Sequence, residues 1–242
     1  KNCFYMFNSV NNKIYKLKSY YWYDFQKALK EISKFYLANK KESFNYFHIP
    51  KTGGKFIKKI LNDNLGRDKF KSFEHIVKAK WINPNYKVLI SIRDPINRLI
   101  SCYYSDIKNY KKNNIGLSKF GLIFYDKYPT VELAIKGFLN KEKEVGYLTQ
   151  LGLLSSINYW GDENFFRKLK NLKIIRTEFL QEDILNFLSN EFEDKGNWVS
   201  IINEFKGDHF RQTEKKEYEL DNKLKSELRD FLRDEYKIYN YL

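Results

Sequence analysis

Cysteine is scarce in this sequence, with Cys3 and Cys102 the only two among 242 residues. Two cysteines cannot form a disulfide framework, and neither lies in the C-x-x-C spacing typical of zinc sites. We therefore expect a reducing compartment. Apolar runs long enough to cross a bilayer are also lacking, and no segment has the layout of a secretory signal.

Arginine is scarce as well. Of the 44 basic residues, eight are arginine and 36 are lysine, against 30 acidic residues. The formal net charge of +14 thus comes from a lysine excess, which together with abundant Asn, Ile, Tyr and Phe is typical of a genome-wide compositional bias. Basic and acidic residues are interleaved along the chain, which predicts a solvated surface rather than a nucleic-acid-binding stripe. We expect no specific nucleic-acid partner.

Linkers rich in proline, glycine or serine are absent, and no tandem repeat is found. The four prolines are spread out, each at an expected element boundary: Pro50, Pro84, Pro95 and Pro129. A chain of this length can bury a real core. We predict one domain over residues 44–242, preceded by an N-terminal extension, residues 1–43, with a hairpin at 3–18 and an amphipathic helix at 20–39.

Strands and helices are predicted to alternate along the domain. The expected strands are Phe44–Ile49, Lys87–Ile92 and Lys173–Arg176, and the expected helices cover Phe56–Leu65, Ile96–Tyr104, Leu180–Leu188 and Glu217–Tyr239. Such alternation predicts a three-layer α/β fold, with a mainly parallel central sheet flanked by helices on both faces. Ligands of these sheets bind outside the carboxyl ends of the strands.

Two glycines, two lysines and a hydroxyl lie where the first strand passes into its helix, in the segment His48–Lys55. Glycine lets the backbone approach a ligand closely, and the unpaired N–H groups of a helix start favour an anion. A Walker A loop does not match, because Ile49 replaces its first glycine and Phe56 replaces the magnesium-binding Ser or Thr. The segment predicts a P-loop-like phosphate site and disfavours a magnesium-dependent kinase.

The second strand ends in a turn that holds a quarter of the arginines, Arg93 and Arg98. Arg93 leaves the strand tip, where a rigid guanidinium fork suits a phosphate. Ser101 lies two turns into the following helix and can face the same pocket if that helix runs alongside it. Purely structural roles are the alternatives: Arg93 paired with Asp94 or capping the helix, and Ser101 as a small residue in a helix contact.

Together these segments resemble the sulfotransferases that use 3'-phosphoadenosine 5'-phosphosulfate (PAPS), in particular the bacterial and Golgi carbohydrate sulfotransferases related to heparan sulfate 2-O-sulfotransferase. Pro50–Gly54 matches their 5'-phosphosulfate loop, and Arg93–Tyr104 matches their 3'-phosphate motif. Thr177–Asp183 is similar to the family's Glu-Asn-Leu-x-x-Asp stretch, and Tyr218–Tyr241 is similar to its closing helix. The resemblance covers about residues 44–242.

The resemblance implies a role for each matched residue. Lys51 would place its ammonium against the oxygen that bridges sulfur and the 5'-phosphate, and Arg93 and Ser101 would hold the 3'-phosphate and select PAPS over ATP. The donor-binding residues implied are Lys51, Thr52, Gly53, Gly54, Lys55, Phe56, Arg93 and Ser101. Lys55-Phe56 stands where the family usually has Thr-Ser or Thr-Thr, so a hydroxyl contact to the phosphosulfate is lost or is replaced by a cation. No metal is implied.

The acceptor hydroxyl needs a base, and the chain has three histidines, His48, His75 and His209. Relatives place a histidine before a helix between the two motifs, which favours His75, and an imidazole pKa of about 6.5 suits proton transfer at neutral pH. Glu74 is the alternative, since other sulfotransferases use a glutamate. We expect His48 to be a buried core residue and His209 a surface residue.

The sequence thus predicts sulfuryl transfer from PAPS to a hydroxylated acceptor. The resemblance favours a sugar or glycan, while nothing in the residues separates a sugar from a steroid or a peptide tyrosine. A P-loop nucleotide-dependent kinase and a basic polyanion-binding module without catalysis are the alternatives. We expect a bacterial-type cytoplasmic enzyme, or a Golgi protein if an anchor precedes Lys1.

Overall fold

Strands and helices alternate in the part of the chain that the computed structural model describes, which comprises residues 42–73, 79–113, 124–142, 157, 160–192, 198–204 and 220–242. The expected N-terminal hairpin and helix lie outside these residues. The candidate bases Glu74 and His75, and also His209, lie outside them too.

The central sheet has four strands. They are β1 (Phe44–Phe47), β2 (Phe70–Phe73), β3 (Lys87–Ile92) and β4 (Asn171–Arg176), in the order β2-β1-β3-β4. Every neighbouring pair is parallel, with Tyr46 of β1 opposite Ser72 and Leu89. The predicted parallel sheet is therefore confirmed, with β2 as an edge strand that the sequence pattern did not indicate.

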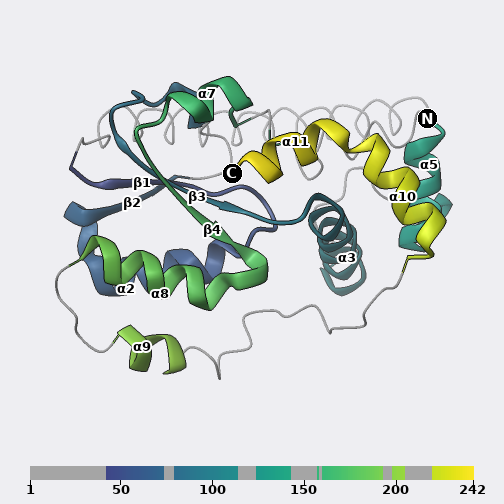
Figure 1. Cartoon of the computed structure of the whole chain (residues 1–242). Coiled ribbons are helices and arrows are strands. Elements are labelled where there is room, and N and C mark those ends of the chain that lie inside the picture. Colours follow the sequence, from purple (N-terminus) through teal and green to yellow (C-terminus); the bar gives the residue numbers. More distant parts are fainter. Residues whose placement is uncertain are drawn as a thin grey trace, which may run out of the picture.

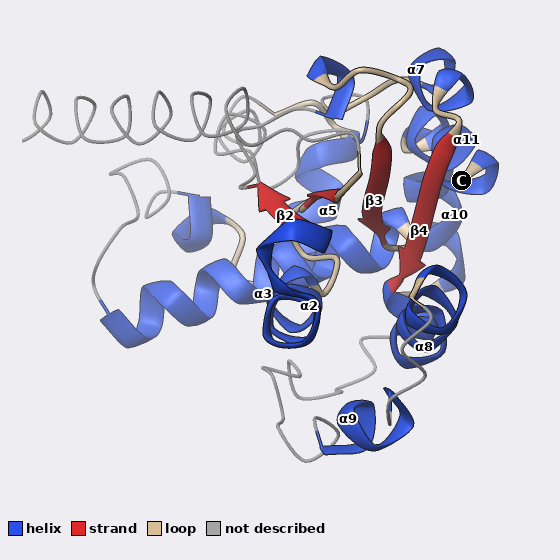
Figure 2. Ribbon diagram, turned by 90° about the vertical axis from the view of Figure 1, so that its left-hand side faces the viewer, coloured by secondary structure: helices blue, strands red, loops and turns tan. Residues whose placement is uncertain are grey.

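Helices cover both faces of this sheet. In chain order they are α2 (Gly54–Lys69), α3 (Pro95–Asn113), α5 (Val131–Leu139), α7 (Glu163–Lys168), α8 (Leu180–Glu191), α9 (Trp198–Glu204), α10 (Asn222–Phe231) and α11 (Arg233–Tyr241), with 3-10 turns η1 (Ala79–Trp81) and η4 (Thr177–Phe179). Figure 1 places α2 and α8 below the sheet and α7 and α11 above it, and Figure 2 shows the red strands enclosed by blue helices. The three-layer α/β prediction is confirmed.

The alternation of side chains in β3 divides the core between the two faces. Val88, Ile90 and Ile92 pack in the cluster that includes α7 and α11, whereas Leu89 packs with α2 and α8. Successive residues of a strand point to opposite faces, so a strand covered on both sides reads as a continuous apolar run. Ser91 is the polar exception in this run, and it is fully buried.

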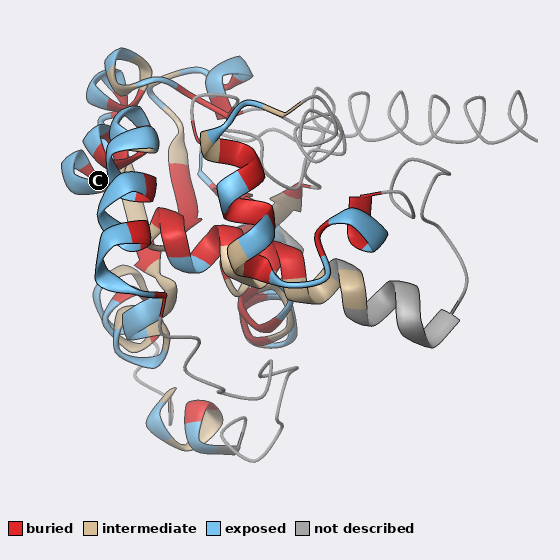
Figure 3. Ribbon diagram, turned by 90° about the vertical axis from the view of Figure 1, so that its right-hand side faces the viewer, coloured by how far each residue is buried: buried red, intermediate tan, exposed pale blue. Residues whose placement is uncertain are grey.

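A third apolar cluster lies beyond the sheet, where α3, α5 and α10 pack together. Figure 3 shows buried residues alternating with exposed ones along these helices, as expected of amphipathic segments. The Tyr103 hydroxyl of α3 donates a hydrogen bond of 2.7 Å to the Tyr128 carbonyl oxygen, and burial raises the pKa of Tyr103 to about 12. None of the described helices combines the length and the apolar character needed to cross a bilayer.

The prediction of one long C-terminal helix over Glu217–Tyr239 is wrong. Two helices, α10 and α11, meet at Leu232, whose φ of −89° and ψ of 19° break the helical path. Leu228 of α10 packs with α3 and α5, whereas Ile238 of α11 packs against the sheet. The break follows from these two different packing partners, which helical periodicity alone cannot show.

Other boundaries differ less. The first strand ends at Phe47 rather than Ile49, β4 begins at Asn171 rather than Lys173, and α8 extends to Glu191. The strand over Lys87–Ile92 has the predicted bounds. The helices α5, α7 and α9 were not predicted.

Candidate functional site

The loops that follow β1 and β3 meet at the carboxyl ends of these neighbouring strands. The chain leaves β1 toward β2 and leaves β3 toward β4, so the strand order reverses between β1 and β3. In open α/β sheets this reversal is where ligands bind. The Arg93 guanidinium donates from Nη1 to the Lys51 carbonyl oxygen at 3.4 Å, which joins the loops directly. The structure thus brings together the two motifs singled out in the sequence.

The loop after β1 turns through the left-handed region twice. Gly53 has a φ of 76°, which is unstrained for glycine, and Lys51 has a φ of 67°, which is rare for a residue with a side chain. Backbone strain of this kind clusters at functional sites. Gly53 is the N-cap of α2, and its carbonyl oxygen accepts from Phe56 N at 3.0 Å.

The start of α2 presents a cluster of backbone donors. Within the described part of the chain, no acceptor is found for the N–H groups of the four residues Thr52, Gly53, Gly54 and Lys55. These donors lie at the N-terminal, positive end of α2, where an anion is favoured. The loop therefore fits a phosphate or sulfate group.

Gly54 packs directly against the imidazole of His48. A Cβ placed on Gly54 would lie 1.9 Å from His48 Cδ2 and Nε2. His48 is 8% exposed and stacks on Tyr46, with ring centroids 6.1 Å apart. The prediction that His48 is a buried core residue is confirmed, and its ring determines how closely α2 approaches β1.

Three buried hydroxyl groups, those of Thr52, Ser91 and Tyr46, form a chain of hydrogen bonds that anchors the loop to the core. Thr52 Oγ1 donates to the Ile49 carbonyl oxygen at 2.8 Å and is hydrogen-bonded to Ser91 Oγ at 2.5 Å. Ser91 Oγ is also hydrogen-bonded to the Tyr46 hydroxyl at 2.7 Å. The Thr52 side chain therefore points into the core, which leaves only its backbone for a ligand. Sequence reasoning missed Ser91, whose one signal is a polar residue inside an apolar strand.

The Lys51 ammonium reaches across to α3, where it donates to Ser105 Oγ. Ser105 lies four residues after Ser101, and this spacing puts both serines on one face of the helix. Ser101 is half-buried. Sequence reasoning missed Ser105, although the helical spacing from Ser101 was a signal that could have found it.

The side chains of Lys55 and Phe56, at the start of α2, have different environments. Lys55 is exposed, so its ammonium is accessible at the loop. Phe56 is 9% exposed and packs in the core cluster between α2 and α8. The structure therefore places the Phe56 ring in the core rather than at the surface of the loop.

The turn after β3 is held by neighbours from three elements. Asp94 caps α3, with Oδ1 accepting from Asn97 N at 2.9 Å. The Asp94 N–H donates to Glu178 Oε1 at 2.9 Å, and the Tyr236 hydroxyl donates to Asp94 Oδ2 at 2.8 Å. Burial lowers the pKa of the Arg93 guanidinium, and the charges of Glu178 and Asp94 oppose that shift.

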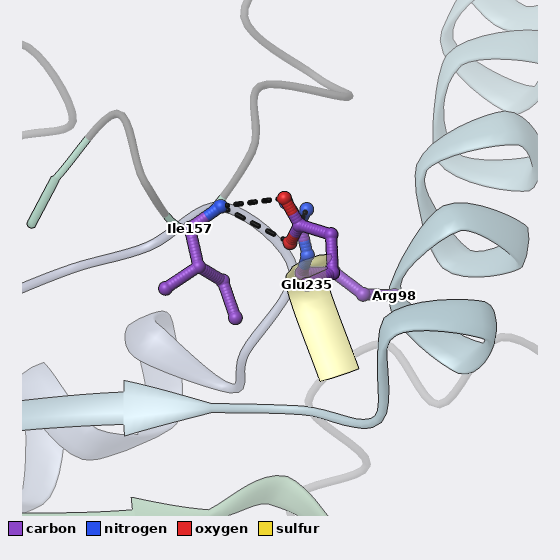
Figure 4. A network of polar contacts seen from close by, with 3 residues as sticks. All are labelled: Arg98, Ile157 and Glu235. Carbon is purple, nitrogen blue, oxygen red and sulfur yellow. Dashed lines mark hydrogen bonds and ion pairs between the residues drawn. The ribbon is translucent and has the colours of Figure 1, made fainter. Parts of the chain in front are cut away.

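Arg93 and Arg98 have different environments. In the described part of the chain Arg93 forms no ion pair, so the alternative of an Arg93–Asp94 pair is not what the structure shows. Arg98 is 5% exposed, and its Nη2 lies 3.4 Å from Glu235 Oε2. Figure 4 shows Arg98 beside the Glu235 carboxylate, which also accepts hydrogen bonds of 3.0 and 3.1 Å from Ile157 N. Arg98 thus links α3 to α11 inside the protein.

Comparison with known proteins points to the same class. Residues 34–132 match the family described as the sulfotransferase family. The matched segment contains the loop after β1 and the turn after β3. Neither the curated proteins nor the solved structures compared with the chain gave a match. The family match supports a sulfotransferase family for this chain, and with it sulfuryl transfer as the class of reaction, in agreement with the resemblance found in the sequence.

Proposed function

We propose that this protein is a PAPS-dependent sulfotransferase that transfers a sulfuryl group to a hydroxyl of an acceptor, with a carbohydrate as the acceptor class. The observation that carries the proposal is the hydrogen bond from Arg93 to the Lys51 carbonyl oxygen, which puts a guanidinium beside the backbone donors of Thr52–Lys55. A ligand with two separate anionic groups matches this pair of sites.

The residues at hand fit such a donor. The N–H groups at the start of α2 suit the 5'-phosphosulfate, and Lys55 adds an accessible positive charge. Arg93 and Ser101 suit the 3'-phosphate, which ATP lacks, because a guanidinium fork binds phosphate oxygens in pairs. The backbone donors at the start of α2 suit any nucleotide phosphate, so Arg93 and Ser101 are the residues that select PAPS.

PAPS supplies an activated sulfuryl group and a nucleotide leaving group when it is bound. Transfer of such a group depends mainly on positioning and on electrostatic stabilisation of the departing oxygen. Lys51 carries the ammonium that stabilises this charge, and Ser105 holds Lys51 Nζ beside α3. His75 takes the proton of the acceptor hydroxyl, and Glu74 is the alternative base.

Binding of adenosine 3',5'-bisphosphate tests the proposal first. We expect this nucleotide to raise the melting temperature without added metal, because a ligand that binds only the folded state stabilises it by about 2.7 kcal/mol at a hundredfold excess over Kd. ATP with magnesium should have less effect. Stabilisation by ATP with magnesium, without any effect of the bisphosphate, would favour a kinase. Tight, salt-sensitive binding of random DNA without any nucleotide effect would favour a polyanion-binding module.

The role of His75 is tested with PAPS labelled in the sulfuryl group and a panel of hydroxylated acceptors. We expect His75→Ala to abolish transfer and leave the Kd for the bisphosphate nearly unchanged, because a base contacts the acceptor rather than the nucleotide. Glu74→Gln is the matched variant. Full activity of His75→Ala with inactive Glu74→Gln would assign the base to Glu74.

A further inference from the structure

The helix α11 reaches the turn that follows β3 through one side chain. The Tyr236 hydroxyl donates a 2.8 Å hydrogen bond to Asp94 Oδ2, across 142 positions of the sequence. Tyr236 is 6% exposed. A buried hydroxyl thus contacts the residue next to Arg93, to which the proposed function gives the 3'-phosphate.

The Asp94 carboxylate competes with a bound phosphate for the Arg93 guanidinium when it is free to approach it. An aspartate beside an arginine is a natural ion-pair partner, and its charge repels a phosphate. Both of its oxygens are engaged elsewhere, Oδ1 by Asn97 N and Oδ2 by the Tyr236 hydroxyl. In the described part of the chain the Arg93 guanidinium accordingly has no ion-pair partner, and its hydrogen bond goes to the Lys51 carbonyl oxygen.

The position of Tyr236 is itself well determined. The Arg229 guanidinium lies over its ring, 4.5 Å from the centroid. The preceding residue, Glu235, is held by Arg98 and by Ile157 N inside the protein. Burial and the contact with Asp94 raise the pKa of Tyr236, so its hydroxyl remains a donor at neutral pH.

We propose that Tyr236 is a specificity-determining positioning residue, which holds the Asp94 carboxylate away from Arg93 and so leaves the guanidinium available to a 3'-phosphate. This inference rests on the proposed function. It adds that α11, which is remote in sequence from both motifs, determines how strongly the site prefers a 3',5'-bisphosphorylated nucleotide to a 5'-phosphorylated one.

The test compares two nucleotides on Tyr236→Phe, which removes only the hydroxyl. Isothermal titration gives the Kd for adenosine 3',5'-bisphosphate and for adenosine 5'-phosphate. We expect the Kd for the bisphosphate to rise about tenfold, since a hydrogen bond to a charged group is lost and the freed carboxylate competes for Arg93. The Kd for adenosine 5'-phosphate should not change. A merely structural defect would weaken the binding of both nucleotides to the same extent.

Two further variants sharpen the test. Tyr241→Phe is the matched control, because Tyr241 lies on the same helix, is 39% exposed and contacts Arg167 through its ring. It should leave both Kd values unchanged. Asp94→Ser in the Tyr236→Phe background keeps a helix-capping oxygen and removes the competing charge, so it should restore the preference for the bisphosphate.

Each outcome is decisive. An unchanged ratio of the two Kd values in Tyr236→Phe, or a preference that Asp94→Ser does not restore, overturns the inference and leaves the proposed function intact. A wild-type protein that binds neither nucleotide overturns the proposed function, and the inference with it.

Discussion

In the loop after β1, three consecutive residues each have a structural constraint that limits substitution. The Thr52 side chain is used inside the protein, Gly53 lies in the left-handed region, and Gly54 contacts the His48 ring. A phosphate bound here would therefore be contacted by the backbone, whose N–H groups do not depend on side-chain identity. Backbone contacts of this kind do not require the Walker residues.

Gly54→Ala tests the contact between α2 and His48. The added Cβ would lie 1.9 Å from the imidazole, so the ring or the helix start must move. We expect the free energy of unfolding to fall by about 1–3 kcal/mol, as is typical of overpacking, and the affinity for the bisphosphate to fall with it. Urea denaturation and titration measure the two effects.

The double variant His48→Ala, Gly54→Ala supplies the control. Removing the imidazole frees the space that the new Cβ needs, so Gly54→Ala should cost less stability in the His48→Ala background than in the wild type. Equal costs in both backgrounds would contradict the packing argument.

At the scale of elements, α11 has two functions in the structure. It covers the sheet through Ile238, and it reaches α3 through Glu235 and Tyr236. At the break at Leu232 the chain departs from the helical path of α10, and in α11 Ile238 packs against the sheet while Tyr236 packs in the cluster with α3 and α5. Secondary structure and site geometry are coupled at this break.

Glu235→Ala tests the link between α11 and α3. It would leave the Arg98 guanidinium buried without its carboxylate, and breaking a buried pair on one side costs about 3–5 kcal/mol. Chemical denaturation should show this loss. Asp234→Ala is the matched control on the same helix, because the Asp234–Lys237 pair is exposed and exposed pairs contribute little. A similar loss in both variants would argue against a specific role of the buried pair.

At the scale of the whole molecule, the net charge of +14 says less than the placement of a few cations. Lys51 and Arg93 come from the loops after neighbouring strands, and Arg93 contacts the Lys51 carbonyl oxygen next to the backbone donors at the start of α2. The other lysines are interleaved along the sequence with 30 acidic residues. The local arrangement of charge, not its sum, supports an anionic ligand.

Local patterns in the sequence predicted much of the fold. The strand Lys87–Ile92 was predicted with its observed bounds, and the helices that follow β1, β3 and β4 were predicted in place, because apolar periodicity and loop residues act over a few positions. The edge strand β2 was missed, since Phe70–Phe73 is short and becomes a strand only by pairing with β1. The C-terminal break at Leu232 was missed for the same kind of reason.

The sequence by itself determined the parallel α/β architecture and the two loop motifs to which we assign anion binding, since both follow from residues close together in the chain. Only the tertiary structure decided that Ser91 anchors Thr52, that Ser105 holds Lys51, and that Tyr236 engages Asp94. These contacts join residues 39, 54 and 142 positions apart. A hydrogen bond forms only between atoms a few ångströms apart, and which distant residues come that close depends on how the strands pair and where the helices break.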